Sequence, residues 1–469
     1  MSTQSLYPKL DVRASLAEAS SIPLWFDDPR RPEPRPSLSG AHSADLVIVG
    51  GGFTGLWAAL LAKEQQPDRR VILIEANTVG WAASGRNGGF CSASLTHGYD
   101  NGKKHLPNEV DVLEQLGMEN LAEIEATIAR YQMDCGFERS GEIMVALHPH
   151  QERELASAHD PDNGQYWLDQ TALKEHIDSP LFLGGLWDTQ RNALVNPAQL
   201  CWELARVITD LGVDIFENSL VTQVSSTPWG IKVETRTGEV RAAKVILGTN
   251  VFPSLIPALR FHTVPVYDYV LATEPLTQEQ LEAIGWSRRQ GISDVGNQFH
   301  YFRLTPDNRI LWGGWDAVYH FGRRIKPAFD QRSATFTTLA THFHHTFPQL
   351  SGVKFSHAWG GAIDTCTRFF PFFHSSHGGA VVSALGFTGL GVGASRFAAR
   401  VMLDLLSDNP SPLCELEMVR QKPLPFPPEP LAWLGIQLTT RALIRSDQQH
   451  GRRGPWLTML DAFGVGFDS

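Results

Sequence analysis

The chain has 469 residues, of which 42% are hydrophobic, 10% aromatic and 19% charged. At roughly 150 residues per domain this length indicates two or three domains, and the composition excludes a disordered chain. The 50 acidic and 40 basic residues give a net charge of −10, which argues against a nucleic-acid-binding protein that works by neutralising phosphates.

The first 43 residues are predicted to form an extended arm, because they are rich in Pro, Ser and Arg and hold one apolar cluster at residues 23–26. They contain no apolar stretch of the kind that a secretory signal needs, which argues against export by that route. The five cysteines are scattered, without a CxxC pair, and form no pattern typical of a zinc site or a disulfide framework. These features predict a reducing compartment, and we expect a cytoplasmic protein.

A dinucleotide-binding unit is predicted next, where strand DLVIVG, a glycine turn, helix GLWAALLAKEQQ and strand RVILIE follow one another. Gly50, Gly52 and Gly55 form a GxGxxG pattern, and Glu75 ends the second strand. The glycines allow a tight turn, close approach of a pyrophosphate and packing of helix on strand, while the acid can bind a ribose diol. This context disfavours a ligand-free glycine turn, but it does not distinguish NAD from FAD.

Further elements alternate along the chain. Residues 105–135 are predicted to be helical and to lead into a hairpin around residues 140–147, and Asn196-Pro197 is expected to cap the next helix. Residues 213–250 and 263–358 are rich in strand patterns, with one helix before Pro348. Residues 369–395 lack any charge and are as long as a membrane span, but their glycines, serines and histidines favour a short buried strand and a turn.

Several segments resemble, in order, the D-amino-acid-oxidase-like (DAO) family of FAD-dependent oxidoreductases. The segment IEANTVGWAASGRNGGF resembles the loop that runs from the adenosine ribose toward the flavin ring. The strand ending Ser219-Leu220-Val221 resembles the one whose Val backbone meets the adenine, and AAKVILGTN and ALGFTGLGVGASRFAARVMLDLL resemble later marks of the family. The resemblance spans about residues 44–408. The segments GWAASGRNGG and YFRLTPDNRILWGG are most similar to its γ-glutamylputrescine oxidoreductase branch.

The resemblance implies an α/β fold of the glutathione-reductase/D-amino-acid-oxidase type, in which a Rossmann-like FAD-binding domain is interleaved with a β-rich, α+β substrate domain. After the arm at 1–43, we expect FAD-binding pieces at 44–105, 195–260 and 360–408, and substrate-binding pieces at 106–194 and 261–359. The C-terminal tail, 409–469, is expected to hold an amphipathic helix that packs on its own or a neighbouring subunit. Docking to another partner or to a membrane surface is the alternative.

The resemblance also implies the contacts of FAD. Residues 84–87 are expected at the pyrophosphate and flavin side, and residues 386–389 are expected to donate backbone N–H groups to the flavin pyrimidine, where negative charge develops. Non-covalent FAD is favoured, since Cys366 lies several residues from the position, nearer Gly361, at which some relatives attach the flavin. The implied contacts are Gly50, Gly52, Phe53, Thr54, Gly55, Glu75, Ala76, Ser84, Gly85, Arg86, Asn87, Gly88, Gly89, Val221, Thr249, Asn250, Gly386, Phe387, Thr388 and Gly389.

The substrate side is expected to be aromatic with few polar anchors, because an amine can pass a hydride to flavin N5 with little acid–base help. Arg303 is the predicted anchor of an anionic substrate end, and Asp268 could hold an ammonium group or accept a proton. A surface ion pair and a solvated strand carboxylate are the respective alternatives. The candidate wall residues, for which plain core packing is an equal alternative, are Tyr267, Tyr269, Tyr301, Trp312, Trp315 and Trp359.

Departures from the sarcosine-oxidase branch narrow the expected activity. That branch has a lysine near flavin N5 where this chain has Trp315 or Asp316, so oxidase activity stays open. It also clamps carboxylates with basic residues where this chain has Phe90 and Gly393, which disfavours a simple N-methyl amino acid. The histidines 342, 344 and 345 have poor spacing for a metal and are interpreted as solvated helix residues.

We therefore expect an enzyme that uses FAD to oxidise a primary or secondary amine to an imine, which water hydrolyses. The amine could be γ-glutamylputrescine-like, a polyamine or an amino acid, and O2 or another acceptor would reoxidise the flavin. The alternative is a FAD-binding subunit of a larger dehydrogenase assembly without amine oxidase activity of its own. A NAD-linked dehydrogenase is disfavoured by the later FAD-like segments, and neither a nucleic-acid partner nor a transmembrane segment is expected.

Overall fold

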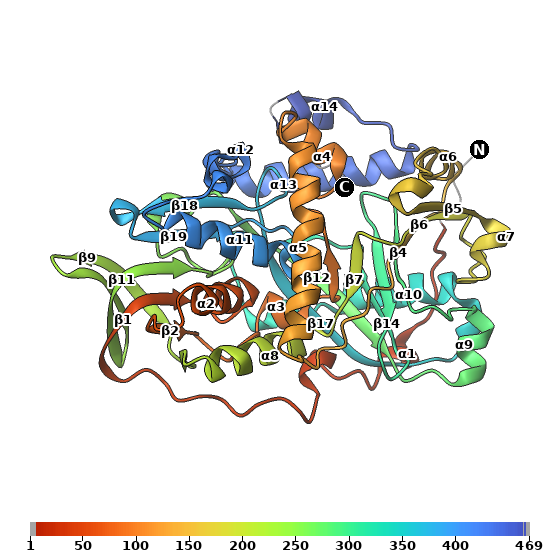
Figure 1. Cartoon of the computed structure of the whole chain (residues 1–469). Helices are drawn as coiled ribbons and strands as arrows, with labels where there is room; N and C mark the ends of the chain where they lie inside the picture. The colour runs from red at the N-terminus through yellow and green to blue at the C-terminus, as the bar shows by residue number, and fades with distance from the viewer. Residues whose placement is uncertain (1–5, 463, 466–469) are drawn as a thin grey trace.

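The computed structural model describes residues 6–462 and 464–465, which form two large sheets with helices around them (Figure 1). The first sheet lies in the left half of Figure 1, with β1 parallel to β2 and β11, and with β8 and β19 extending the parallel set. Every residue of β2 and β19 is buried, as expected for parallel strands covered on both faces. Its strands are β18 (Phe372–Ser376), β19 (Val381–Leu385), β11 (Gly238–Leu247), β1 (Gly40–Val49), β2 (Val71–Ile74) and β8 (Asp214–Phe216), with β10 (Gly230–Thr235) and β9 (Val221–Thr227) attached to β11.

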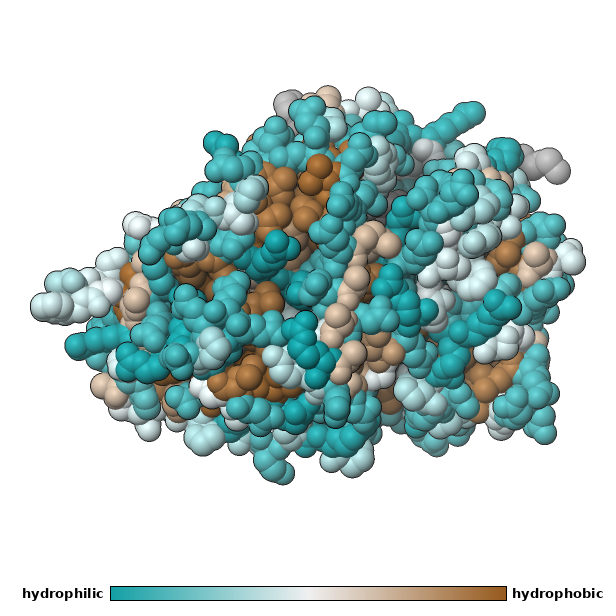
Figure 2. Space-filling view, in the orientation of Figure 1, coloured by the Kyte–Doolittle hydropathy of each residue, from teal (hydrophilic) through white to brown (hydrophobic). Residues whose placement is uncertain are grey.

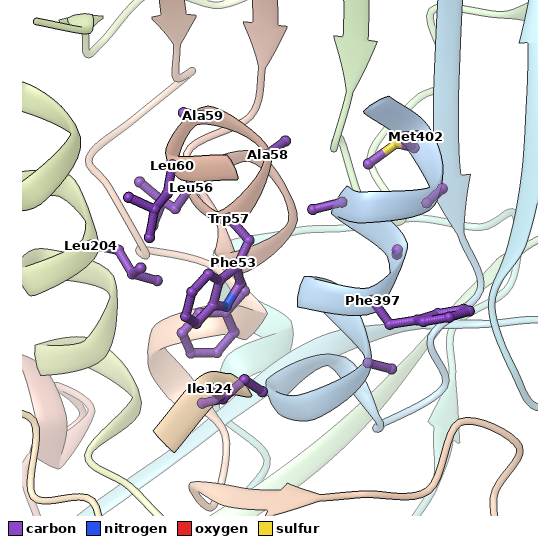
Figure 3. Packing of buried hydrophobic residues seen from close by; sticks show 14 of the residues in the cluster. Phe53, Leu56, Trp57, Ala58, Ala59, Leu60, Ile124, Leu204, Phe397 and Met402 are labelled. Carbon is purple, nitrogen blue, oxygen red and sulfur yellow. The ribbon is translucent and has the colours of Figure 1, made fainter. Parts of the chain in front are cut away.

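Four helices bury the apolar side chains of this first sheet. Figure 3 shows α2 (Phe53–Gln65) with Phe53 and Trp57 pointing toward Ile124 of α5 (Val110–Arg130), while Leu204 of α8 (Pro197–Asp210) lies on its other side. Helix α11 (Gly391–Leu405) completes the cluster and also bonds to α5 through Arg396 and Glu123, 3.0 Å apart. The sequence-based assignment of α5 to the substrate domain was therefore wrong, because the apolar face of α5 packs on α2 and α11.

The second sheet fills the right half of Figure 1 and is mostly antiparallel. Its strands are β16 (Val318–Tyr319), β12 (Val264–Thr273), β15 (Ile310–Gly314), β14 (His300–Leu304), β13 (Gly291–Asp294), β4 (Glu142–Ala146), β6 (Gly184–Asp188) and β5 (Gln165–Asp169), with β17 (Phe355–Thr365) paired to β12. Strand β4 pairs with β13 and β6 rather than with a sequence neighbour, so the expected local hairpin at residues 140–147 does not form. Strand β17 crosses the expected boundary between residues 359 and 360.

Shorter elements connect the two sheets or cover the second one. They are α1 (Arg13–Leu16), α3 (Ala83–Arg86), β3 (Phe90–Ser92), α4 (Tyr99–His105), α6 (Pro149–Ser157), α7 (Gln170–Leu173), β7 (Asn192–Leu194), α9 (Gln278–Ile284) and α10 (Ser333–Thr346). Strands β3 and β7 pair with each other, and each stands in the sequence between a strand of one large sheet and a strand of the other. The chain thus passes repeatedly between the two halves, which places residues from both at one interface.

The N-terminal arm packs on both halves. Val12 belongs to the core of the second sheet, Leu38 belongs to that of the first, and Trp25 lies in a small cluster with Trp359 between them. The Trp25 indole N–H donates a hydrogen bond of 2.8 Å to the carbonyl of Asn87. The described part of the arm contains the short helix α1 and a 3-10 turn at Leu24–Phe26, and its contacts tie the two halves together.

The C-terminal tail folds back on its own chain as α12 (Glu417–Arg420), α13 (Leu431–Gln448) and α14 (Pro455–Ala462). Helix α13 runs across the top of the molecule in Figure 1, behind α5. Within the described residues, no helix combines the length and apolar character that a membrane crossing requires. The face in Figure 2 is covered mainly by hydrophilic residues, with apolar patches between them, in keeping with the charged composition.

Candidate functional site

One cavity of about 2340 Å³ runs between the two sheets. Its walls include Gly50 and Glu75, which directly follow β1 and β2, and Asp268 and Tyr301, which lie on β12 and β14. Ligands of open α/β sheets bind at this end of the parallel strands. Ordinary small-molecule pockets span roughly 300–1,000 Å³, so this cavity has room for a dinucleotide and a second molecule.

The glycine turn after β1 has the geometry that a bound pyrophosphate needs. Gly50 has φ +110°, and a Cβ there would lie 2.4 Å from the carbonyl oxygen of Gly248. At Gly55 a Cβ would lie 1.9 Å from the carbonyl oxygen of Gly50, so helix α2 can approach β1 only without a side chain. The residues Gly52, Phe53 and Thr54 at the start of α2 line the cavity, where the helix dipole favours an anion.

Glu75 is positioned by three donors. Its carboxylate accepts hydrogen bonds from the backbone N–H of Gly51 (2.6 Å), the backbone N–H of Asn77 (2.8 Å) and the indole N–H of Trp81 (2.7 Å). Burial raises the pKa of Glu75, while these donors favour its ionised form. A carboxylate has about four acceptor positions, which leaves capacity for a ribose hydroxyl.

The loop after β2 is ordered by its own side chains. The Asn87 amide donates to the carbonyl of Ala83 (2.9 Å) and accepts from the backbone N–H of Gly89 (2.8 Å). Arg86 forms an ion pair of 2.5 Å with Asp330 of the second half and donates to the carbonyl of Trp81 (2.7 Å). The guanidinium of Arg86 is thus engaged in tying the two halves together, which differs from the expected pyrophosphate contact.

In the closing turn at residues 386–389, before α11, some of the backbone N–H groups that were expected to bind the flavin donate to other groups of the protein. The Gly386 N–H donates to the Asp364 carboxylate (2.6 Å), and the Thr388 N–H donates to the Asp364 carbonyl (3.1 Å). This corrects the expectation that both N–H groups are available to the flavin. Burial raises the pKa of Asp364 to about 7. The partly buried His97, which also lines the cavity, contacts the Thr388 carbonyl through Nε2 (2.6 Å) and so helps to fix the turn.

Cys366 lies behind this turn and does not line the cavity among the described residues. Its thiol donates to the carbonyl of Phe370 at 3.2 Å. Gly361, nearer the position of covalent attachment in some relatives, does line the cavity but carries no nucleophile. The geometry therefore gives no support to a cysteine-linked flavin.

The predicted cofactor residues divide into a wall and its support. Gly55, Gly85, Gly89 and Gly386 do not line the cavity; they allow close backbone packing behind it. This cradle fits FAD: the α2 N-terminus would hold the pyrophosphate, Glu75 the ribose, and the strand at Val221 the adenosine end. The predicted cofactor residues that do line the cavity are Gly50, Gly52, Phe53, Thr54, Glu75, Ala76, Ser84, Arg86, Asn87, Gly88, Val221, Thr249, Asn250, Phe387, Thr388 and Gly389.

On the substrate side, Asp268 and Tyr301 form a hydrogen-bonded pair at the cavity wall. The Tyr301 hydroxyl donates to Asp268 Oδ2 at 2.6 Å. Removal of the carboxyl from bulk water raises the pKa of Asp268 from 3.8 to about 6, although Tyr301 and neighbouring backbone donors act in the opposite direction. Asp268 is thus mainly ionised at neutral pH and changes charge just below it.

The candidate aromatic residues separate by strand alternation. Asp268 faces the cavity, so its neighbours Tyr267 and Tyr269 direct their rings into the core of the second half, where Trp312 also packs. Tyr267 still touches the cavity. Trp359 lines it and donates its indole N–H to the carbonyl of Arg86 at 2.9 Å. The aromatic wall consists of Phe90, Phe299, Tyr301, Trp315 and Trp359.

Arg303 is not at the cavity, which corrects its prediction as a substrate anchor. Its side chain is 1% exposed and donates to the carbonyl of Val195 at 2.7 Å and to that of Gly89 at 3.4 Å. Burial lowers the pKa of Arg303 to about 10. The guanidinium therefore joins β14 to the loop and strand of the cofactor side.

The predicted exposure of His342 was also wrong. His342 is buried, and its Nδ1 lies 3.0 Å from Nε2 of His300, whose Nδ1 lies 2.8 Å from Asp294. The ring of Tyr7 in the N-terminal arm stacks on His342 at 3.8 Å and covers it. His344 and His345 are partly exposed on the same helix.

The charges that line the cavity are mostly negative. The lining cations Arg86 and Arg191 both form ion pairs within the protein, Arg191 with Asp188 (3.2 Å) and Glu114 (3.8 Å), and no lysine lines the described part of the wall. Opposite them stand the carboxyl groups of Glu75, Asp100, Asp111, Glu114, Glu142, Glu154, Asp188, Asp268, Asp316 and Asp364. Three of these carboxyl groups are themselves ion-paired, Glu114 and Asp188 with Arg191 and Asp316 with Arg332. On the substrate side, where Asp268 stands, the remaining carboxyl groups favour a cation over an anion.

Sequence reasoning missed Asp364, His97 and the contribution of α13. Ile436, Thr439, Thr440 and Leu443 of α13 line the cavity, far along the chain from every motif. Asp364 and His97 act through backbone groups of the closing turn, which no local pattern indicates. The amphipathic pattern of the tail identified the helix but not the surface that it covers.

Comparison with known proteins agrees with this site. The FAD dependent oxidoreductase (DAO) family matches residues 45–405. A protein named probable oxidoreductase OrdL from Haemophilus influenzae is 29% identical over 81% of this chain and 87% of its own length, and gamma-glutamylputrescine oxidoreductase from Escherichia coli is 30% identical over 80% and 86%.

Solved structures of other flavoenzymes share the fold. Glycine oxidase from Geobacillus kaustophilus superposes with a TM-score of 0.67 at 18% identity, covering 81% of this chain and 99% of its own. At that identity the likeness concerns the fold, while the family match over most of the chain concerns descent. The chain belongs to the DAO family of FAD-dependent oxidoreductases.

Proposed function

We propose that this FAD-dependent oxidoreductase oxidises a primary or secondary amine to an imine, which water then hydrolyses to a carbonyl compound and an amine or ammonia. FAD, when bound, supplies the two-electron acceptor for the hydride that leaves the α-carbon of the amine. The observation that carries the proposal is the Asp268–Tyr301 pair at the wall of an acidic, aromatic cavity.

Asp268 would attract the ammonium form of the substrate and take a proton from it. Only a neutral amine has the nitrogen lone pair that assists loss of hydride, so a base at this place raises the reactive fraction. The hydrogen bond from Tyr301 fixes the orientation of the carboxylate. Tyr301 and Trp359 would hold the substrate against the cofactor side of the cavity and exclude water.

The aromatic wall supports a cationic substrate in a second way. Faces of Trp and Tyr attract an ammonium group by about 0.5–2 kcal/mol, depending on how far it is desolvated. The cation would then meet both a carboxylate and aromatic faces before it is deprotonated.

Lack of an available anion clamp favours amines without a carboxylate next to the nitrogen. Arg86 and Arg191 are occupied by Asp330, Asp188 and Glu114, and Arg303 lies behind the wall. A relative at 30% identity is named gamma-glutamylputrescine oxidoreductase, which also directs the proposal to amines at the end of an alkyl chain. We therefore place diamines, polyamines and their γ-glutamyl derivatives ahead of α-amino acids.

The experiment is anaerobic addition of amines to the purified FAD-bound protein, followed by visible absorbance. We expect an alkyl diamine or its γ-glutamyl derivative to bleach the flavin, and an α-amino acid of the same length to do so at least tenfold more slowly. Aeration with a peroxide assay then shows whether O2 is the acceptor. Failure of every amine to bleach a fully flavin-loaded protein would overturn the proposal and favour a non-catalytic FAD-binding subunit.

A further inference from the structure

Helix α13 lies outside the residues that match the family, 45–405, yet it forms part of the cavity wall. Its cavity-lining residues are Ile436, Thr439, Thr440 and Leu443, which stand at positions i, i+3, i+4 and i+7 of the helix. Residues at this spacing share one face of a helix. Helix α13 therefore presents one continuous face to the same space that Asp268 and Tyr301 line.

The helix is fastened at its C-terminal end to the aromatic wall. The Asp447 carboxylate accepts from the backbone N–H of Asn297 (3.1 Å), from its side-chain amide (2.5 Å) and from the backbone N–H of Gln298 (3.2 Å). The next residue, Phe299, lines the cavity with its ring 6.4 Å from that of Tyr301. The last turn of α13 thus sits beside the proposed substrate site.

The N-terminal end of α13 is fastened by Glu429. Its carboxylate accepts from the hydroxyl of Tyr319 on β16 and from the backbone N–H of Gly322 at 3.0 Å, and it also caps the helix through the N–H of Trp433 at 3.1 Å. Helix α14 packs on α13 and ties it to α4, since Trp456 donates to the Thr439 hydroxyl (3.0 Å) and Asp461 pairs with Lys104 of α4 (2.8 Å).

The face that α13 gives to the cavity differs chemically from the opposite wall. It carries two aliphatic side chains and two hydroxyls and no charge, whereas all the carboxyl groups that line the cavity stand on other parts of the described chain. A substrate that bridges these surfaces needs an ammonium end and an uncharged carbon chain. Burial of each methylene contributes on the order of 0.8 kcal/mol, which makes such a wall sensitive to chain length.

We propose that α13 is a specificity element of the active site, in which Ile436 and Leu443 bind the alkyl portion of the amine substrate. The inference rests on the proposed amine chemistry and adds which part of the chain selects the substrate. Two side chains on the outer face of the same helix, Leu434 and Leu438, are 46% and 47% exposed and provide a matched control.

The test measures binding of linear alkylamines of increasing length to the FAD-bound protein, through the shift that a bound amine produces in flavin absorbance. In the wild type, affinity should increase by up to about fourfold per methylene. In Ile436→Ala/Leu443→Ala this gain per methylene should fall below about twofold, while the affinity for FAD stays unchanged. Leu434→Ala/Leu438→Ala should behave as the wild type does.

A second variant guards against a loss that comes only from disturbed packing. Leu443→Phe adds volume to the wall and should weaken the longest amines at least tenfold while leaving the shortest within twofold. If amines reduce the flavin but the length dependence is the same in wild type, cavity-facing variants and control, the role of α13 is wrong and the amine chemistry stands. If no amine binds to or reduces the flavin of the wild type, both proposals are wrong.

Discussion

The two sides of the cavity are built from different materials. The cofactor side consists of glycine turns, helix starts and backbone N–H groups that follow β1, β2 and β11 within short stretches of sequence. The substrate side consists of side chains from β12, β14, β17 and α13, which are far apart in the sequence and meet only through sheet pairing and tail docking. The first side is determined by backbone geometry and the second by tertiary contacts.

This difference explains where function can vary. The cofactor is bound largely through backbone N–H groups, which nearly every residue has. The sequence is therefore constrained mainly at the glycine positions, where a side chain would block the close approach. Substrate choice depends on which side chains the sheet and the tail bring to the wall.

The largest effect is expected from a methyl group in the glycine turn. Gly55→Ala places a Cβ 1.9 Å from the Gly50 carbonyl oxygen, so α2 must shift away from β1 and the pyrophosphate cradle opens. We expect at least a hundredfold weaker FAD binding, measured by equilibrium dialysis against FAD. Gly51→Ala, whose nearest contact would be 3.1 Å from a Glu75 side-chain atom, serves as the milder neighbour. Equal FAD affinity in Gly55→Ala and the wild type would contradict the backbone account of this side.

On the substrate side, Asp268→Asn should keep FAD and lose turnover. A positioned base typically accelerates a reaction about 10²–10⁴-fold. We expect the turnover rate to fall by a factor near the lower end of this range, because the aromatic wall remains. With the pKa of Asp268 at about 6, its carboxyl is protonated below that pH, so wild-type kcat/KM should fall tenfold per pH unit there. The variant should lack this acidic limb, as a pH profile of flavin reduction would reveal. An unchanged limb in Asp268→Asn would assign the titration to another group.

A smaller effect, on stability alone, is expected at Arg303. Arg303→Met leaves the carbonyl of Val195 without its donor, which typically costs about 1–3 kcal/mol. Urea unfolding followed by tryptophan fluorescence measures the loss. The ratio of KM values for a carboxylate-bearing amine and for a plain alkylamine should not move, because the guanidinium lies behind the wall. A selective rise in KM for the carboxylate-bearing amine would restore Arg303 as a substrate anchor.

The smallest effect is expected from a glycine-to-alanine substitution in α13, on the substrate side of the cavity. At Gly435 in α13 an added Cβ would meet no atom within 4 Å. Gly435→Ala should therefore stabilise the helix by about 0.5–1 kcal/mol, since glycine has the greater backbone entropy to lose. Thermal unfolding of the FAD-bound protein should show a small rise in midpoint, with amine affinity unchanged. A fall in midpoint would reveal a contact that this position makes.

The cofactor side of the cavity could be predicted from the sequence more completely than the substrate side. The GxGxxG turn and Glu75 can be recognised from local spacing, because backbone chemistry needs glycine at fixed offsets, whereas the loop at residues 84–89 was identified by its resemblance to the family. Asp268 and Trp359 were selected by residue type, and both line the cavity. Arg303 was misplaced although it shares a face of β14 with Tyr301, because it lies farther along the strand, where Gly89 and Val195 cover it, and residue type alone does not reveal this cover.

The tail and the buried histidines lay beyond sequence reasoning for a related reason. The amphipathic pattern of α13 is the same whether its apolar face covers a cavity, a neighbouring subunit or a membrane, and only the contacts of Glu429 and Asp447 distinguish these. His342 sits on a helix of ordinary pattern and is buried by rings from distant parts of the chain, those of His300, Trp315 and Tyr7.

The arm that carries Tyr7 also affects how the protein unfolds and how it can be shortened. Val12 and Leu38 pack into different cores, and Trp25 packs against Trp359 between them. Unfolding of either half therefore disrupts contacts that the arm makes with the other half. The two halves should therefore unfold as one cooperative block despite their separate sheets. A shortened chain that begins at Ala44, where the first motif starts, would expose both cores and the region around Trp359 at once.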